Sequence, residues 1–251
     1  MARRLTSAEH WLLLLDFDGT LVPLTSDPDQ VRLDPVVRQV LRRLAHHPRA
    51  TVYIISGRRL ANLRRVVTVP GLHLLGLHGW ERPGVSFPRG ERRLLREAKR
   101  WLAPRLPRSP GIKLEDKGLS LAVHHRGAAR PAAQRARRVT RQARDRFRPG
   151  LHLLAGKKMW ELLPAAVDGK GSATQWLLGK LPRRALPIFI GDDVSDEAAF
   201  AVLPHGLTLH VGGKAGTKAR FWLRNPGEVR EFLGRLEAMI NCKRPSVRSN
   251  S

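Results

Sequence analysis

The chain has 251 residues, of which 42% are hydrophobic, and its 46 basic and 21 acidic residues give a net charge of +25. A chain of this length can bury a sizeable core in one large or two smaller domains, which excludes a peptide-like or disulfide-stapled scaffold. The single cysteine, Cys242, excludes an internal disulfide and a cysteine-rich zinc site. No apolar run reaches the roughly 18 residues that span a bilayer, and no signal peptide is evident, so we expect a soluble, cytoplasmic protein.

Four short apolar runs each end abruptly in polar residues. They are residues 11–15 before Asp16, 51–55 before Ser56, 72–77 before His78, and 185–190 before Gly191. Such runs indicate strands that are buried on both faces of a parallel sheet. Helical patterns lie between or after them, at residues 34–45, 60–67, 171–181 and 195–203. The alternation predicts a doubly wound, Rossmann-like α/β fold, in which ligands bind at the carboxyl ends of the strands.

The segment from residue 84 to residue 164 breaks this alternation. It contains a helical pattern (91–103), two strands (112–115 and 119–125), an Arg-rich helix (131–147) and two further strands (151–155 and 158–163). This order predicts an inserted α+β cap domain, residues 84–164, within a discontinuous core of residues 1–83 and 165–241. The tail, residues 242–251, has no apolar face, and we expect it to be disordered.

The positive charge has two interpretations. Arginine makes up 36 of the 46 basic residues, and a uniform excess of arginine is often a compositional habit of the source genome. Residues 89–148, however, hold 16 Arg and 3 Lys against 5 acids, a net +14, and such a basic segment also suits nucleic acid. Because the Arg-rich helix lacks interleaved aromatic residues and any recognised DNA-binding motif, we expect no specific nucleic-acid binding. We likewise expect no membrane association.

Two carboxylates, Asp16 and Asp18, follow the first predicted strand. Gly19 permits a sharp turn that can swing the second carboxylate over the first. This pairing suits covalent catalysis, in which one carboxylate attacks and its neighbour moves a proton. The alternative is an Asx turn that merely closes the strand.

A second acidic cluster follows the last predicted strand and contains Asp192, Asp193, Asp196 and Glu197. Four carboxylates within six residues repel one another unless a cation neutralises them, and an all-oxygen set suits Mg²⁺. Asp192 is the metal candidate. The alternative is a helix N-terminus with Ser195 as the cap, where acidic residues favour the helix dipole.

Two weaker patterns supply possible anion ligands. Ser56, Gly57 and Arg58 offer a hydroxyl, a backbone amide and a guanidinium group, which together can hold an oxyanion at a helix start. Lys170 lies between two glycines at the start of a helix, where a solvated lysine is the ordinary expectation.

In this order, the four patterns DFDGTL, SGR, GKG and GDDVSDE resemble the motifs of the haloacid dehalogenase superfamily of phosphotransferases. Further stretches are similar to the trehalose-6-phosphate phosphatase family: HGWE from His78, EDKG from Glu115, LSLAVHHR from Leu119 and ELLP from Glu161. Two departures exist. The usual Asn-His-Gly of the family is Leu77-His78-Gly79 here, and the loop before Lys170 is one residue longer.

The resemblance implies a Mg²⁺-dependent phosphatase that hydrolyses trehalose 6-phosphate through an aspartyl phosphate. It makes Asp16 the nucleophile and Asp18 the acid and base, with Ser56 and Lys170 on the phosphoryl group. It assigns Mg²⁺ to Asp16, Asp192 and the backbone carbonyl of Asp18. Supporting positions are Gly57, Asp193 and Asp196.

The resemblance also assigns the sugar to the cap and its surroundings. The residues it implies as substrate-binding are Arg58, Glu81, Lys117, His124, Arg126 and Glu161. Strand alternation puts His124 and Arg126 on one face, so we interpret His125 as structural and Trp160 as a buried aromatic. An alternative is another sugar-phosphate phosphatase of the same superfamily. We expect a monomer with a possible functional link to a trehalose-6-phosphate synthase.

Overall fold

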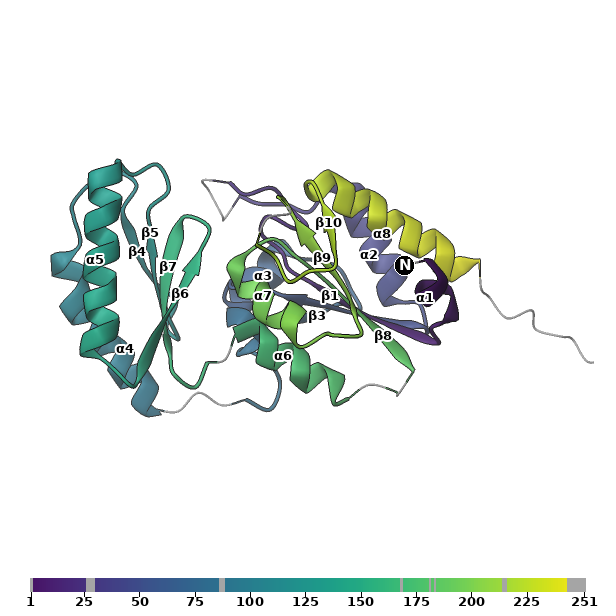
Figure 1. Ribbon diagram of the computed structural model, residues 1–251, viewed down its shortest axis with the longest axis horizontal. Helices are drawn as coiled ribbons and strands as arrows, with labels where there is room; N and C mark the ends of the chain where they lie inside the picture. Colours follow the sequence, from purple (N-terminus) through teal and green to yellow (C-terminus); the bar gives the residue numbers. More distant parts are fainter. Residues whose placement is uncertain are drawn as a thin grey trace, which may run out of the picture.

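Two separate β-sheets organise the protein. The computed structural model describes residues 2–25, 30–85, 89–167, 169–180, 182, 184–213 and 216–242. One sheet has six strands in the order β10-β9-β8-β1-β2-β3, and the other has four in the order β4-β5-β7-β6. Figure 1 shows the two sheets at opposite ends of the molecule, each with its own helices. The predicted α/β core with an inserted α+β cap is confirmed.

The core sheet is parallel throughout. Its strands are β1 (His10–Leu15), β2 (Ala50–Ile55), β3 (His73–Leu75), β8 (Ala185–Gly191), β9 (Leu207–Val211) and β10 (Phe221–Leu223). The apolar run that forms β1 lies in the middle, paired with β2 on one side and β8 on the other. From β1 the chain continues outward through β2 and β3 before the inserted segment, and it returns at β8. The strand order therefore switches direction at β1, which is where such sheets bind ligands.

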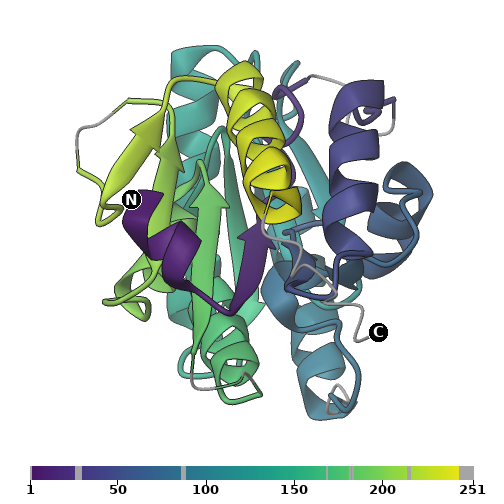
Figure 2. The same ribbon diagram turned by 90° about the vertical axis from the view of Figure 1, so that its right-hand side faces the viewer.

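Helices cover both faces of the core sheet. On one face lie α2 (Pro35–Ala45), α3 (Leu60–Val66), α8 (Pro226–Asn241) and the short α1 (Ala2–Ser7); on the other lie α6 (Gly169–Leu178) and α7 (Val194–Ala201). Figure 2 shows α8 beside α2. Alternate leucines of β1 serve the two faces: Leu13 packs toward α2 and α8, whereas Leu14 packs toward α6 and α7. This double burial explains why the strand reads as a continuous apolar run.

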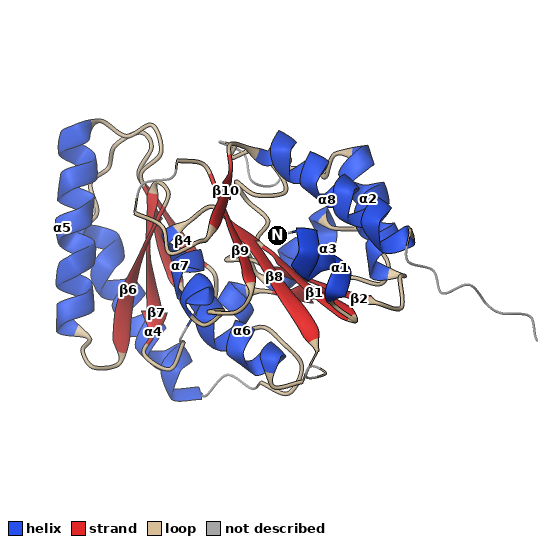
Figure 3. Ribbon diagram, turned by 45° about the vertical axis from the view of Figure 1, so that its right-hand side comes forward, coloured by secondary structure: helices blue, strands red, loops and turns tan. Residues whose placement is uncertain are grey.

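The cap consists of the elements from α4 to β7. They are α4 (Arg89–Leu102), β4 (Lys113–Asp116), β5 (Leu121–His124), α5 (Arg130–Arg146), β6 (Leu151–Gly156) and β7 (Met159–Pro164). A 3-10 turn, η1 (Leu77–Gly79), precedes the cap, and a second, η2 (Ala103–Arg105), follows α4. Both long helices pack on one face of the antiparallel sheet (Figure 3). Leu121 and Val123 of β5 lie in that apolar layer. Their neighbours Ala122 and His124 alternate to the opposite face, which is turned toward the core.

Some expectations need correction. The strand predicted over residues 119–125 is shorter, because β5 ends at His124, and Arg126 lies in the turn that follows. The sequence interpretation also omitted α1, β9, β10 and α8. Of the predicted disordered tail, residues 243–251 lie outside the described residues. No helix in the described part of the chain is long and apolar enough to cross a membrane.

Candidate active site

Three predicted site residues follow adjacent strands of the core sheet. Asp16 comes directly after β1, Ser56 after β2 and Asp192 after β8, and all three are buried. The Asp16 backbone N–H donates to the carbonyl of Ile190 at 2.9 Å, which extends the pairing of β1 with β8 past the end of β1. Parallel pairing therefore gathers these side chains at one edge of the sheet.

Lys170 is the cation at the centre of this edge. Its Nζ donates to Asp16 Oδ1 at 2.6 Å and to Asp196 Oδ1 at 2.7 Å. Only 2% of the residue is exposed, so the expectation of a solvated lysine is wrong. A Cβ on Gly171 would lie 3.1 Å from the Cβ of Ala198, so glycine allows α6 to approach α7 closely. This approach brings the ammonium group to Asp196.

Asp196 also belongs to the cap of α7. The N-cap is Asp193 and not Ser195, because the Asp193 carboxylate accepts the Val194 N–H at 2.8 Å and the helix already begins at Val194. In return, the Asp196 carboxylate accepts the Asp193 N–H at 2.9 Å. One oxygen of Asp196 thus completes a capping box while the other binds Lys170. Asp196 thus fixes the position of the Lys170 ammonium group, and its supporting role in catalysis stays a prediction.

The turn after Asp16 is built around Gly19. Its φ is +85°, and a Cβ there would lie only 2.1 Å from Asp192 Oδ2, so glycine is required for this backbone to meet Asp192. Thr20, to which the sequence interpretation gave no role, directs its Oγ1 between two carboxylates, at 3.5 Å from Asp16 Oδ2 and 3.4 Å from Asp192 Oδ1. Its place inside the first motif was the available signal.

Asp16, Asp192 and Asp196 form a cluster that could hold a metal ion. One carboxylate oxygen from each lies within 4.8 Å of the others. Burial raises the pKa of Asp16 well above its usual value; Lys170 opposes this shift, whereas the charges of Asp196 and Asp192 add to it. Excess negative charge in an all-oxygen donor set fits a hard divalent cation. The predicted ligands Asp16 and Asp192 are brought together, and the Asp18 carbonyl belongs to the same turn as Gly19.

The Asp18 side chain points to a different partner. Its two oxygens accept from Arg58 Nε at 2.7 Å and Nη2 at 2.6 Å, a bidentate pair. Arg58 is fixed in turn by Asn62, to whose Oδ1 it donates at 2.8 Å, and by the ring of Phe17. The Arg58 backbone N–H donates to Ser56 Oγ at 3.1 Å. Arg58, expected on the sugar, therefore orients Asp18.

The cap contributes a buried polar group that faces the core. Glu161 of β7 accepts from Lys117 Nζ at 3.0 Å and from Ser120 Oγ at 2.5 Å. On its other oxygen it meets His78 Nε2 at 3.1 Å, and Lys117 also donates to the carbonyl of Gly57 at 3.0 Å. Burial alone would raise the pKa of Glu161, but the Lys117 ammonium and the hydrogen bonds from His78 and Ser120 bring that pKa well below its usual range. The expected pair Lys117 and Glu161 thus lies beside the residue that follows Ser56.

The remaining expected sugar contacts are each paired with another group of the protein. The Glu81 carboxylate accepts the Leu60 N–H at the start of α3. His124 pairs with Glu115 at 2.8 Å, and Arg126 donates to the carbonyl of Thr25 at 2.6 Å. His125 stacks on Trp160 with ring centroids 4.0 Å apart. Trp160 packs against the apolar layer of the cap but is only partly buried, so the expectation of a buried aromatic is wrong, and the structural role of His125 stays a prediction.

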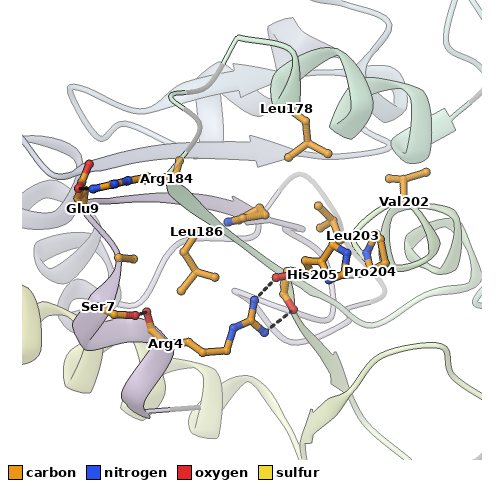
Figure 4. Close-up of a pocket in the computed structure, with 14 residues that line it drawn as sticks. Arg4, Ser7, Glu9, Leu178, Arg184, Leu186, Val202, Leu203, Pro204 and His205 are labelled. Atoms are coloured by element: carbon orange, nitrogen blue, oxygen red, sulfur yellow. Dashed lines mark hydrogen bonds and ion pairs between the residues drawn. The ribbon is translucent and has the colours of Figure 1, made fainter.

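A surface groove of about 550 Å³ lies away from this cluster. It is lined by residues that precede or begin strands of the core sheet, such as Glu9 and Leu186, and so lies at the amino ends of the strands. In Figure 4, Arg4 spans it toward the backbone at His205, and Arg184 pairs with Glu9. The acidic cluster lies at the opposite, carboxyl edge of the sheet.

Comparison with known proteins assigns the chain to a family. A family model described as Trehalose-phosphatase matches residues 14–219. The chain belongs to this family. A trehalose-phosphate phosphatase of Mycobacterium tuberculosis is 34% identical, in an alignment that covers 91% of this chain and 61% of the relative. The chain therefore spans less than two thirds of the length of that relative.

Solved structures share the fold of this trehalose-phosphatase family member. The C-terminal domain of a Candida albicans trehalose-6-phosphate phosphatase covers 94% of both chains, with a TM-score of 0.80 at 22% identity. A trehalose-6-phosphate phosphatase of Aspergillus fumigatus has a TM-score of 0.65 at 27% identity and covers 94% of this chain and 95% of that one. The predicted membership of the haloacid dehalogenase superfamily, with a cap, is confirmed.

Replacing Lys170 with methionine should destabilise the protein in a pH-dependent way. Without the ammonium group, the pKa of Asp16 in the folded state, which burial already raises, rises further above its unfolded value. A raised carboxyl pKa lowers the free energy of unfolding as pH increases. In buffer with a chelator, we expect a loss of about 3–5 kcal/mol near pH 7, measured by denaturant titration, which shrinks toward pH 5.

The control for this experiment is Lys180→Met. Lys180 lies just after α6 and is exposed, with its Nζ 3.8 Å from the ring centroid of Trp176. Its loss should cost less than about 1 kcal/mol. A Lys170→Met penalty that is the same at both pH values would contradict the assignment of an ammonium group that neutralises two buried carboxylates.

Proposed function

We propose that the chain is a Mg²⁺-dependent phosphatase that hydrolyses trehalose 6-phosphate to trehalose and phosphate through an aspartyl phosphate on Asp16. The observation that carries this proposal is the contact of Lys170 with Asp16 inside a carboxylate cluster, at the strand edge where α/β sheets bind ligands. The family of the chain and the polar cap face opposite Gly57 support the choice of substrate.

In the first step, the Asp16 carboxylate attacks the phosphorus. Lys170 binds Oδ1 of Asp16, so Oδ2 is the oxygen available to form the new P–O bond. The bond from phosphorus to the sugar oxygen breaks, and that oxygen takes a proton from Asp18. Arg58 holds the Asp18 side chain at the mouth of the site, where 32% of the side chain is exposed and a leaving group can reach it.

In the second step, Asp18 takes a proton from water, and the water oxygen attacks the phosphorus. The bond to Asp16 breaks, phosphate leaves, and Asp16 returns to its carboxylate form. The Ser56 hydroxyl accepts the Arg58 N–H, so its own hydrogen is available for a phosphoryl oxygen. Lys170 compensates negative charge on Asp16 in both steps.

The metal ion would be held by Asp16, Asp192 and the Asp18 carbonyl, with Asp196 and Asp193 as the supporting carboxylates. When bound, Mg²⁺ supplies positive charge that screens the attacking carboxylate from the phosphate dianion. The protein's own charges leave a need for such a cation, since, among the residues that the structure describes, Asp16, Asp192 and Asp196 pair with two ammonium groups, those of Lys170 and Lys157.

The cap would select the substrate. A disaccharide presents hydroxyl groups, which need paired donors and acceptors rather than an apolar pocket. Lys117 and Glu161 supply both types and lie next to Gly57, one residue from Ser56. We also propose that the cap comprises residues 84–164 and the core residues 1–83 and 165–241, since β7 ends at Pro164. A trehalose-6-phosphate synthase would supply the substrate.

The proposal is tested by phosphate release from a panel of sugar phosphates with and without Mg²⁺. We expect preference for trehalose 6-phosphate, loss of activity in EDTA and recovery when Mg²⁺ is added. Asp16→Asn should lower phosphate release by about 10³-fold or more, because an amide oxygen is a poor nucleophile. An active Asp16→Asn enzyme that folds as the wild type would contradict the mechanism, and equal turnover of glucose 6-phosphate would contradict the substrate.

Cap selection predicts a split between large and small substrates. Lys117→Met should raise the KM for trehalose 6-phosphate by about tenfold, since a buried acceptor loses its charged partner, but should change turnover of p-nitrophenyl phosphate much less. Lys113→Met, an equal change of charge at an exposed position of β4, should leave both substrates unaffected. Equal losses on both substrates in Lys117→Met would show that the cap residue does not select.

A further inference from the structure

The turn between β6 and β7 reaches from the cap to the acidic loop of the core. Lys157, in that turn, places its Nζ 2.6 Å from Asp192 Oδ2. The backbone is close as well, because a Cβ on the preceding Gly156 would lie 2.9 Å from Asp193 Oδ2. This contact is separate from the Lys117, Glu161 and His78 contacts, since it involves the loop after β8 and not the segment after β2.

The two partners of this ion pair lie in different environments. Asp192 is buried, with 2% of its side chain exposed, whereas 43% of the Lys157 side chain is exposed. The ammonium group therefore lies at the boundary between solvent and the carboxylate cluster. An ion pair with one buried partner is screened less by water than a surface pair is.

The same carboxylate that Lys157 binds is a member of the cluster that could hold a metal ion. An ammonium group in contact with Asp192 competes for its oxygen and repels a divalent cation beside it. Lys157 differs in this respect from Lys170, which contacts Asp16 and Asp196 and is itself fully enclosed. Lys157 can leave by movement of a surface turn.

We propose that Lys157 is a positioning residue that couples the cap to the metal site: its ammonium group holds Asp192 when no metal is bound, and the metal displaces it. This inference rests on the proposed Mg²⁺ site. Coupling between two binding events is reciprocal. Binding of the cation therefore weakens the contact of the β6–β7 turn with Asp192 by the same free energy by which that contact weakens binding of the cation. The cation then binds most tightly when the cap turn has moved away from Asp192.

The neighbouring Lys158 provides a matched control. It carries the same charge in the same turn, and its backbone carbonyl accepts the His125 N–H at 3.0 Å. Its backbone has a φ of +62° as part of the turn. The Lys158→Gln variant removes one positive charge from this turn and leaves the contact of Lys157 with Asp192 in place. The two glutamine variants therefore have equal net charge and differ in the contact with Asp192.

The test is calorimetric titration of Mg²⁺ into four full-length proteins: the wild type, Lys157→Gln, Lys157→Arg and Lys158→Gln. We expect Lys157→Gln to bind Mg²⁺ about tenfold more tightly than the wild type, because a neighbouring positive charge is lost. Lys157→Arg should keep the wild-type affinity, and Lys158→Gln should stay within about twofold of it.

Amide hydrogen exchange of residues 154–159 supplies a second measurement that does not depend on activity. In the wild type, Mg²⁺ should accelerate exchange in this turn, whereas in Lys157→Gln exchange should already be fast and insensitive to Mg²⁺. Equal Mg²⁺ affinity in the wild type and Lys157→Gln, or an equal gain in Lys158→Gln, would overturn the coupling and leave the proposed function intact. Absence of Mg²⁺ binding to every protein would overturn both.

Discussion

Everything at the site depends on the enclosed ammonium group of Lys170, which joins a strand end to a helix start. It holds Asp16 after β1 and Asp196 in α7, and Asp196 in turn completes the cap of that helix. Buried carboxylates at such short separation repel one another unless cations lie between them. The cluster is tolerated because ammonium groups compensate part of its charge, and the uncompensated part is what attracts a further cation. A carboxylate nucleophile can approach a phosphate dianion only where nearby positive charge screens it, and Lys170 together with a bound cation would supply that charge.

The cap extends this electrostatic principle beyond the phosphoryl site. Its apolar side is covered by α4 and α5, so its polar side is left to face the core. On that side the buried Glu161 is compensated by Lys117 and His78, one partner from each part of the molecule. Leaving a buried charged group without a partner is costly. A substrate hydroxyl group could therefore take the place of one of these partners, whereas loss of the partner with no replacement would be unfavourable. The cap thus supplies hydrogen-bonding capacity where the core supplies charge.

Sequence patterns predicted the parallel core sheet and the inserted cap, because the apolar runs of strands buried on both faces, and the polar residues that end them, can be recognised locally in the sequence. Asp16, Ser56 and Asp192 were correctly expected to meet, since neighbouring parallel strands end at one edge. The alternative interpretation of the second acidic cluster put the N-cap at Ser195, whereas the cap is Asp193. Both residue types cap helices, and only the backbone geometry decides between them. The local pattern around Lys170 favours a solvated lysine, and only the family resemblance placed it in the site. Its burial depends on the close packing of α6 on α7, which no local pattern specifies. The contact of Lys157 with Asp192 joins residues 35 apart and was equally invisible.

The most direct test of the central claim is acid quenching of the enzyme during turnover of trehalose 6-phosphate, followed by mass spectrometry of its peptides. If Lys170 and the metal allow Asp16 to attack phosphorus, the quenched peptide that contains Asp16 carries an acid-stable, hydroxylamine-sensitive phosphoryl group, and Lys170→Met abolishes it. Phosphate release at the wild-type rate with no phosphoryl group on Asp16, or with the group on another residue, would contradict the account.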